Sequence, residues 1–179
     1  ELRDLASKHP NLVLVKLDVA DPSAISAAVK TVERKLNGAG LNLLINNAGI
    51  YSPTASLETA DAEEMIQAYR TNAVGPMLMA QAFLPLLKKA AQESTEKGLS
   101  CSKAAIINIS TVMGSIQKTP ESFYKPEYLW DLSPAPHLSP LQADLTVDTS
   151  VQGLLSVLVN LSEKHSGTLL NWQGKAIPW

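Results

Sequence analysis

The sequence has 179 residues, of which 45% are hydrophobic, and carries a formal net charge of −2 at pH 7. This length and composition predict one globular domain spanning residues 1–179, with enough apolar surface for a core. The charge balance argues against a nucleic-acid-binding surface, which would need clustered Lys and Arg. No apolar run is long enough to predict a membrane-spanning helix. The lone Cys101 cannot form an internal disulfide, so we expect a reducing, cytoplasmic location.

The first elements alternate between helix and strand. Leu2 and Leu5 have helical spacing before Pro10. The sequence starts inside this helical pattern and without Met, so we expect a piece of a longer protein. A run rich in Leu and Val predicts a mostly buried strand over residues 12–18.

A helix and a second strand follow. Asp21 can cap free helical amides and Pro22 suits the first helical position, so a helix should begin here and end near Gly38. The apolar run at residues 41–46 predicts a second buried strand. A helix between two such strands forms a right-handed βαβ unit, which predicts an α/β fold with a parallel sheet.

The second strand ends in Asn46-Asn47-Ala48-Gly49, which packing alone does not require. Asn side chains can hold a backbone turn, and glycine permits a close approach that a Cβ atom would prevent. In open α/β sheets, ligands bind beyond the carboxyl ends of the strands. We therefore expect these residues at the mouth of a ligand crevice.

The next predicted helix begins at Asp61, which has capping-box spacing to Glu64, and runs to Leu87. Gly75-Pro76 should bend it. Asn72 lies just before this break. On helix propensity alone, an Asn at this place faces solvent.

The residues from Lys88 to Lys103 are polar and predict an exposed loop. A third buried strand is expected at residues 104–109, followed by Ser110 and Thr111. Two hydroxyl residues at a strand end could satisfy backbone groups or take part in chemistry.

The remaining sequence divides into an irregular part and a regular one. Five prolines lie between Gln117 and Gln142, so residues 117–145 read as an irregular insert, in which His137 is a loop residue rather than a metal ligand. Thr146 or Asp148 should cap a helix, and residues 168–172 predict a last parallel strand before a tail.

Asn46-Asn47-Ala48-Gly49 after an apolar strand resembles the signature of the short-chain dehydrogenase/reductase family. The likeness continues at residues 72–75 and 108–116. The latter stretch is most similar to the branch of carbonyl reductases and the C-factor-like, sniffer-like proteins. The resemblance implies a Rossmann-type doubly wound parallel sheet, incomplete in this chain. It also implies an NAD- or NADP-dependent oxidoreductase acting on small carbonyl or alcohol substrates, with NADP favoured, in a homo-oligomer.

The positions that match the family's motifs lie at strand ends or at a helix break. The resemblance implies that Asn72 holds a helix kink and orients a water in a proton relay, and that Thr111 polarises the carbonyl. It implies that Asp18 and Val19 contact the adenine. The site residues expected in this way are, for catalysis, Asn72, Ser110 and Thr111, and, for cofactor binding, Asp18, Val19, Asn46, Ala48 and Gly49.

Two parts of the family pattern are missing from the sequence. It has no Gly-x-x-x-Gly-x-Gly turn, and no tyrosine has a lysine four residues later: Tyr124 is followed by Tyr128, and Lys103 is preceded by Leu99. We therefore read Lys103 as a surface lysine. We expect weak cofactor binding and impaired catalysis, or alternatively a non-catalytic interaction or regulatory isoform.

We also expect the sheet to lack some of the family's strands. The resemblance implies the strand order 3-2-1-4-5-6-7, of which this chain keeps strands 3, 4, 5 and 7. Only the strands at residues 41–46 and 104–109 are then neighbours. Residues 12–18 and 168–172 would expose unpaired edges.

Overall fold

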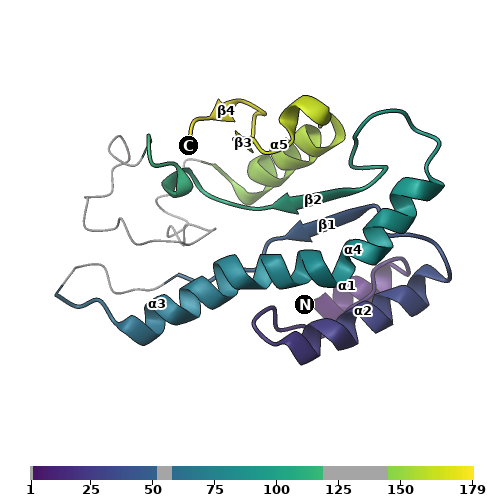
Figure 1. Ribbon diagram of the computed structural model, residues 1–179, viewed down its shortest axis with the longest axis horizontal. Helices are drawn as coiled ribbons and strands as arrows, with labels where there is room; N and C mark the ends of the chain where they lie inside the picture. Colours follow the sequence, from purple (N-terminus) through teal and green to yellow (C-terminus); the bar gives the residue numbers. More distant parts are fainter. Residues whose placement is uncertain (1, 52–57, 119–144) are drawn as a thin grey trace.

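The structure is a computed structural model that describes residues 2–51, 58–118 and 145–179. At its centre, two parallel strands lie between a group of helices, α1 to α4, and a carboxyl-terminal part that holds α5 and a small hairpin (Figure 1). None of the helices in these ranges is long and apolar enough to cross a membrane.

The central sheet has two strands, β1 (Leu43–Asn46) and β2 (Ala105–Asn108). They pair in parallel, from Leu43 opposite Ala105 to Asn46 opposite Asn108. This confirms the parallel strands expected at residues 41–46 and 104–109. The carboxyl ends of both strands therefore meet at one edge of the sheet.

Two helices pack on this sheet and on each other. In α2 (Pro22–Leu36), Asp21 accepts a hydrogen bond from Ser23 N at 2.8 Å, and the helix ends at Asn37 in a left-handed conformation. The helix α4 spans Gly75–Glu93. Together with β1 these helices form the core, whose buried residues are Ile25, Leu44, Met79, Phe83, Leu86 and Leu87.

Two further helices precede α2 and α4 in the chain. Residues 2–8 form the short helix α1 (Leu2–Lys8), as the spacing of Leu2 and Leu5 predicted. The helix α3 (Ala62–Tyr69) begins at Asp61, whose carboxylate accepts from Glu64 N at 3.0 Å, as predicted.

The helix break lies one turn earlier than expected. A five-residue π-helix (Arg70–Val74) joins α3 to α4, and Pro76 occupies the first turn of α4, where its missing N–H costs nothing. The expectation that the helix ends at Leu87 and a loop begins at Lys88 is wrong, because α4 continues to Glu93.

The strand expected at residues 12–18 is absent, which corrects the sequence prediction. A strand needs a neighbour to pair with, and no segment within the described ranges pairs with this one. Leu12, Val13 and Leu14 are 38–45% exposed, whereas Leu17 and Val19 pack against the core. The segment was expected to remain a strand with an unpaired edge, but without a neighbour it forms no strand.

The carboxyl-terminal part agrees with the expectation in its helix but not in its strand. Thr146, rather than Asp148, caps α5 (Val147–Val159) by accepting from Thr149 N at 3.1 Å. The strand β3 (Leu169–Leu170) pairs antiparallel with β4 (Ala176–Ile177) in a separate hairpin, so the predicted parallel strand at residues 168–172 is wrong.

Local turn chemistry explains this hairpin. Asn171 Oδ1 accepts from Gln173 N at 3.0 Å and from Lys175 N at 2.8 Å, and Gly174 has a φ of 78°. Residues that were expected to form a tail therefore include the strand β4, which pairs with β3. Most of the predicted proline-rich insert, with Tyr124, Tyr128 and His137, lies outside the described residues.

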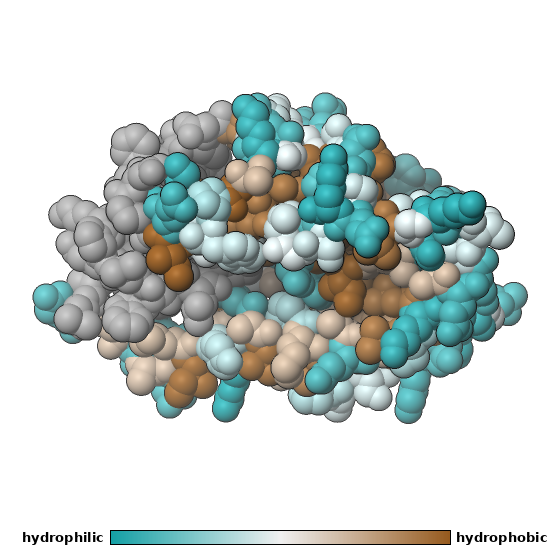
Figure 2. Space-filling view, turned by 45° about the horizontal axis from the view of Figure 1, so that its top comes forward, coloured by the Kyte–Doolittle hydropathy of each residue, from teal (hydrophilic) through white to brown (hydrophobic). Residues whose placement is uncertain are grey.

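Apolar surface remains uncovered on the small sheet. Ile45 of β1 and Ile106 of β2 are both partly exposed, at 43% and 38%. Figure 2 shows hydrophobic side chains interspersed with hydrophilic ones on one face of the molecule. In a parallel sheet, helices on the two faces normally cover such side chains.

Candidate functional site

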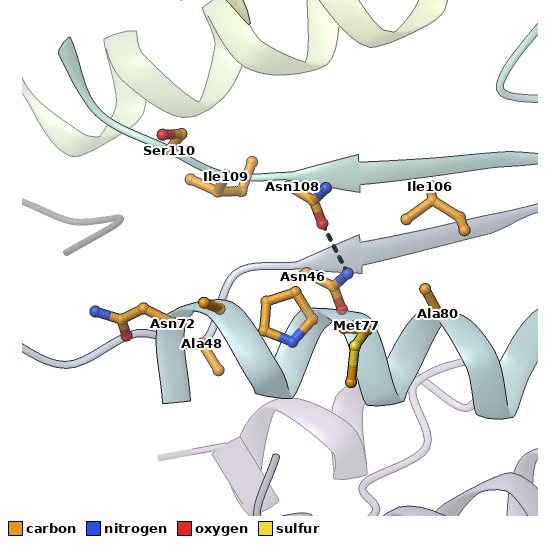
Figure 3. Close-up of a pocket in the computed structure, with 11 residues that line it drawn as sticks. Asn46, Ala48, Asn72, Met77, Ala80, Ile106, Asn108, Ile109 and Ser110 are labelled. Carbon is orange, nitrogen blue, oxygen red and sulfur yellow. Dashed lines mark hydrogen bonds between the residues drawn. The ribbon is translucent and has the colours of Figure 1, made fainter. Parts of the chain in front are cut away.

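A cavity of about 570 Å³ lies at the carboxyl ends of β1 and β2, beside the π-helix and the first turns of α4 (Figure 3). Its lining combines amides and a hydroxyl from the strand ends with apolar side chains from α4. The residues that line it are Asn46, Ala48, Asn72, Ala73, Pro76, Met77, Ala80, Ile106, Asn108, Ile109 and Ser110.

The two strands are joined at this edge by a pair of amides. Asn46 Nδ2 donates to Asn108 Oδ1 at 2.8 Å, and Figure 3 shows the two side chains pointing toward one another. Asn46 is only 9% exposed, so its amide needs a partner. Ile109 N donates to Asn46 O at 2.9 Å, which continues the ladder beyond the strands.

Asn72 does not simply face solvent, as helix propensity alone would favour. Its Oδ1 accepts from Ile50 N at 2.9 Å and its Nδ2 donates to Ile50 O at 2.8 Å. It stands inside the π-helix, where one extra residue per turn turns the side chain toward the segment after β1. The side chain thus holds that segment through both of its backbone groups.

The hydroxyl residues follow β2 in a tight turn. Ser110 lines the cavity, and Thr111 begins a turn in which Gly114 N donates to Thr111 O at 3.0 Å, over the 3-10 helix Val112–Gly114. A Cβ atom on Gly114 would lie 3.1 Å from Ser110 Oγ. The turn therefore packs directly against the Ser110 hydroxyl.

The expected site residues do not all reach the cavity. The structure brings together Asn46, Ala48, Asn72 and Ser110. Asp18, Val19, Gly49 and Thr111 do not line it.

Two of the residues that do not line the cavity have clear contacts elsewhere. Asp18 Oδ1 accepts from Ala20 N at 2.9 Å, so this carboxylate holds a local turn. Val19 packs against Gly75 at the start of α4: a Cβ atom on Gly75 would lie 3.1 Å from Val19 Cγ2.

Sequence reasoning missed Asn108 and the α4 side chains Met77 and Ala80 as cavity residues. Asn108 could have been found from the expected parallel register, because Asn46 ends one predicted strand and Asn108 lies one residue before the end of the other. The α4 residues carried no such signal, since their helical spacing is typical of any packed helix.

Charged groups contribute little to this site. Lys103 stands at the amino end of β2, opposite the cavity, where its Nζ donates to Glu96 O and Gly98 O, both at 3.3 Å. Within residues 2–51, 58–118 and 145–179, no group of His, Cys, Asp and Glu could hold a metal ion.

A parallel α/β sheet with polar side chains at its carboxyl edge is typical of open α/β folds, of which the Rossmann type is one. The chain belongs to the short chain dehydrogenase family, whose profile matches residues 1–125.

Solved structures support this assignment. An NADPH-bound carbonyl reductase from chicken fatty liver superposes with a TM-score of 0.86 at 43% identity, over 99% of this chain and 81% of that one. The carbonyl reductase Sniffer of D. melanogaster superposes with a TM-score of 0.85 at 28% identity, over 99% and 82% of the two chains.

Curated sequence relatives match over shorter stretches. The short chain dehydrogenase tazN of Aspergillus terreus is 37% identical over 93 residues, which are 52% of this chain and 20% of that protein. Two further relatives at the same identity match over 39% and 34% of their own lengths. The chain thus spans less than half the length of these relatives.

Proposed function

We propose that the protein is an oxidoreductase of the carbonyl reductase type that uses a nicotinamide cofactor, NADP rather than NAD. The observation that carries this proposal is the cavity at the carboxyl ends of β1 and β2, where Asn46, Ala48, Asn72 and Ser110 come together. The similarity to an NADPH-bound carbonyl reductase supports the choice of cofactor and of a small carbonyl substrate.

The residues present fit one end of such a cofactor. Asn46 is 9% exposed, and its Oδ1 has no hydrogen-bond partner among the described residues, so a buried acceptor is available beside the cavity. Ala48 and Ala73 leave room at the cavity wall. These 179 residues hold no glycine-rich phosphate turn of the family's kind, so we propose that this stretch by itself binds the cofactor weakly.

When bound, the nicotinamide supplies or accepts the hydride. The hydroxyl of Ser110 has no side-chain partner within the described part of the chain, and it can donate to a carbonyl oxygen in the cavity. Thr111 carries the same kind of donor one residue later. Asn72 keeps the segment after β1 in place through Ile50.

We further propose that this chain is catalytically impaired. An unperturbed tyrosine has a pKa of about 10, so a phenolic acid–base group needs a neighbouring cation to work at neutral pH. No tyrosine of this sequence has a lysine four residues later. Losing general acid–base catalysis reduces a rate by roughly a hundred- to ten-thousand-fold.

The same observation favours a second candidate function, a non-catalytic isoform that acts by interaction or regulation. The two candidates differ in one property, the binding of NADPH. We also propose that the chain forms one partial dinucleotide-binding domain with an insert at about residues 117–145. We propose that this domain works in the cytoplasm and as part of a homo-oligomer.

The test is to measure NADPH binding and NADPH oxidation by the purified chain with aldehydes, ketones and quinones. We expect weak binding, and no oxidation above that of the Ser110→Ala and Thr111→Ala variants. Turnover that disappears in Thr111→Ala would refute the impairment, and an absence of binding at saturating NADPH would favour the non-catalytic isoform.

A further inference from the structure

The strands β1 and β2 are tied together by an Asn side chain at each end. At the amino ends, Asn42 Nδ2 donates to Ser102 O at 2.6 Å and to Lys103 O at 3.2 Å. At the carboxyl ends, Asn46 Nδ2 donates to Asn108 Oδ1 at 2.8 Å. Only the tie at the carboxyl ends lines the cavity.

The Asn46 amide donates to a side chain rather than to backbone. The position of the Asn46 side chain therefore depends on which residue stands at position 108. Asn46 is 9% exposed, and leaving a buried amide without its partner is unfavourable. Asn108 is itself more exposed and stands directly opposite in the register. The chain continues from these two residues to Ala48 and to Ser110, both of which line the cavity.

We propose that Asn108 is a positioning residue of the cofactor site. By holding the amide of Asn46, it sets the spacing of the two strand ends from which Ala48 and Ser110 reach the cavity. It also directs the Oδ1 of Asn46, which has no partner among the described residues, toward the helix side of the cavity, as Figure 3 shows. The inference rests on the proposed function, because it assigns Asn108 an effect on nicotinamide-cofactor binding.

The experiment compares Asn108→Ala with Asn42→Ala, a matched removal of the tie at the other end of the same strands. We expect Asn108→Ala to weaken NADPH binding about five- to tenfold, as loss of one partly buried hydrogen bond implies. Asn42→Ala should lower stability but leave the NADPH dissociation constant within about twofold, because its tie lies away from the cavity. Equal losses of affinity in the two variants would show a merely structural role and overturn the proposal.

A second readout needs no cofactor. Hydrogen exchange of the backbone amides at residues 47–49 and 109–111 should become faster in Asn108→Ala but not in Asn42→Ala. Asn108→Asp keeps an oxygen that accepts from Asn46 Nδ2, so it should restore slow exchange. Unchanged exchange in Asn108→Ala would refute the positioning role whether or not NADPH binds. If the unaltered chain binds no NADPH, the proposed function fails, and with it the link between Asn108 and the cofactor.

Discussion

Gly40 lies so close to Ala90 of α4 that a Cβ atom on residue 40 would stand 2.1 Å from the Ala90 backbone nitrogen. Gly40 N also donates to Glu93 Oε2 at 3.1 Å, and Leu41 N donates to Leu86 O at 3.0 Å. The turn that leads into β1 is therefore fastened to the second half of α4. This contact places β1 on the core.

The close approach predicts a large effect of Gly40→Ala on stability. Because backbone atoms of α4 cannot move aside cheaply, we expect a loss of about 3 kcal/mol in the free energy of unfolding, measured by denaturant titration. Gly38→Ala is the control: no atom lies within 4 Å of its Cβ position, but its φ of 91° adds strain. The control should lose only about 1 kcal/mol, and equal losses would contradict this explanation.

The bond between Asn72 and Ile50 predicts the effect of a nearly isosteric change. Asn72→Asp keeps an acceptor for Ile50 N but loses the donor to Ile50 O and turns a carboxylate toward that carbonyl. We expect a loss of about 1–3 kcal/mol in the free energy of unfolding, together with faster hydrogen exchange at Ile50 N. Exchange at Ile50 that matches the unaltered chain would show that the amide does not hold this segment.

A third prediction concerns the loop between α4 and β2. The hydroxyls of Ser100 and Ser102 donate to Glu96 at 2.7–3.1 Å, and they lower the pKa of this carboxyl, with a smaller effect from Lys103. Because the folded pKa lies below the ordinary value of 4.5, the bonds stabilise the loop above that pH and weaken as pH falls through the folded pKa. The contribution is present at neutral pH.

An NMR titration of the Glu96 carboxyl checks this prediction. We expect the midpoint to lie below 4.5 and to rise in a Ser100→Ala/Ser102→Ala double variant. Protection of the loop amides, measured as the intrinsic exchange rate at each pH divided by the observed rate, should fall over the same pH range. A midpoint that does not change in the double variant would contradict the assigned cause.

Local signals predicted the helices well. Asp21, Asp61 and Thr146 each accept a hydrogen bond from a backbone N–H in the first helical turn, an interaction that depends only on neighbouring residues. The strands were harder. An apolar run predicted β1, but a similar run at residues 12–18 formed no strand, because pairing depends on a neighbour that lies elsewhere in the chain.

Only some of the residues that line the cavity were predicted, because others depend on how distant strands pair. The predicted strand ends and the predicted helix break marked four residues that the structure brings to one cavity: Asn46, Ala48, Asn72 and Ser110. Asn108 was missed because its place depends on the parallel register between two distant strands. The antiparallel return of β4 beside β3 depended on the Asn171 turn, which the strand pattern alone did not reveal.

The last prediction concerns Ser115, which is completely buried and has 0% exposure. Its hydroxyl donates to Pro178 O and accepts from Lys118 N at 3.1 Å, while Gln117 N donates to Trp179 O at 3.2 Å. The last residues of the chain are thereby bound to the turn that follows Ser110 and Thr111.

Replacing this hydroxyl should loosen that turn. Ser115→Ala removes the donor to Pro178 O and the acceptor for Lys118 N in a site closed to water, so we expect a loss of about 1–3 kcal/mol in the free energy of unfolding. Hydrogen exchange at residues 114–118 should quicken together with exchange at residues 176–179. Ser156→Ala, at an exposed serine of α5, is the control and should change stability by less than about 0.5 kcal/mol. If exchange quickened at only one of the two segments, Ser115 would not be the link between them.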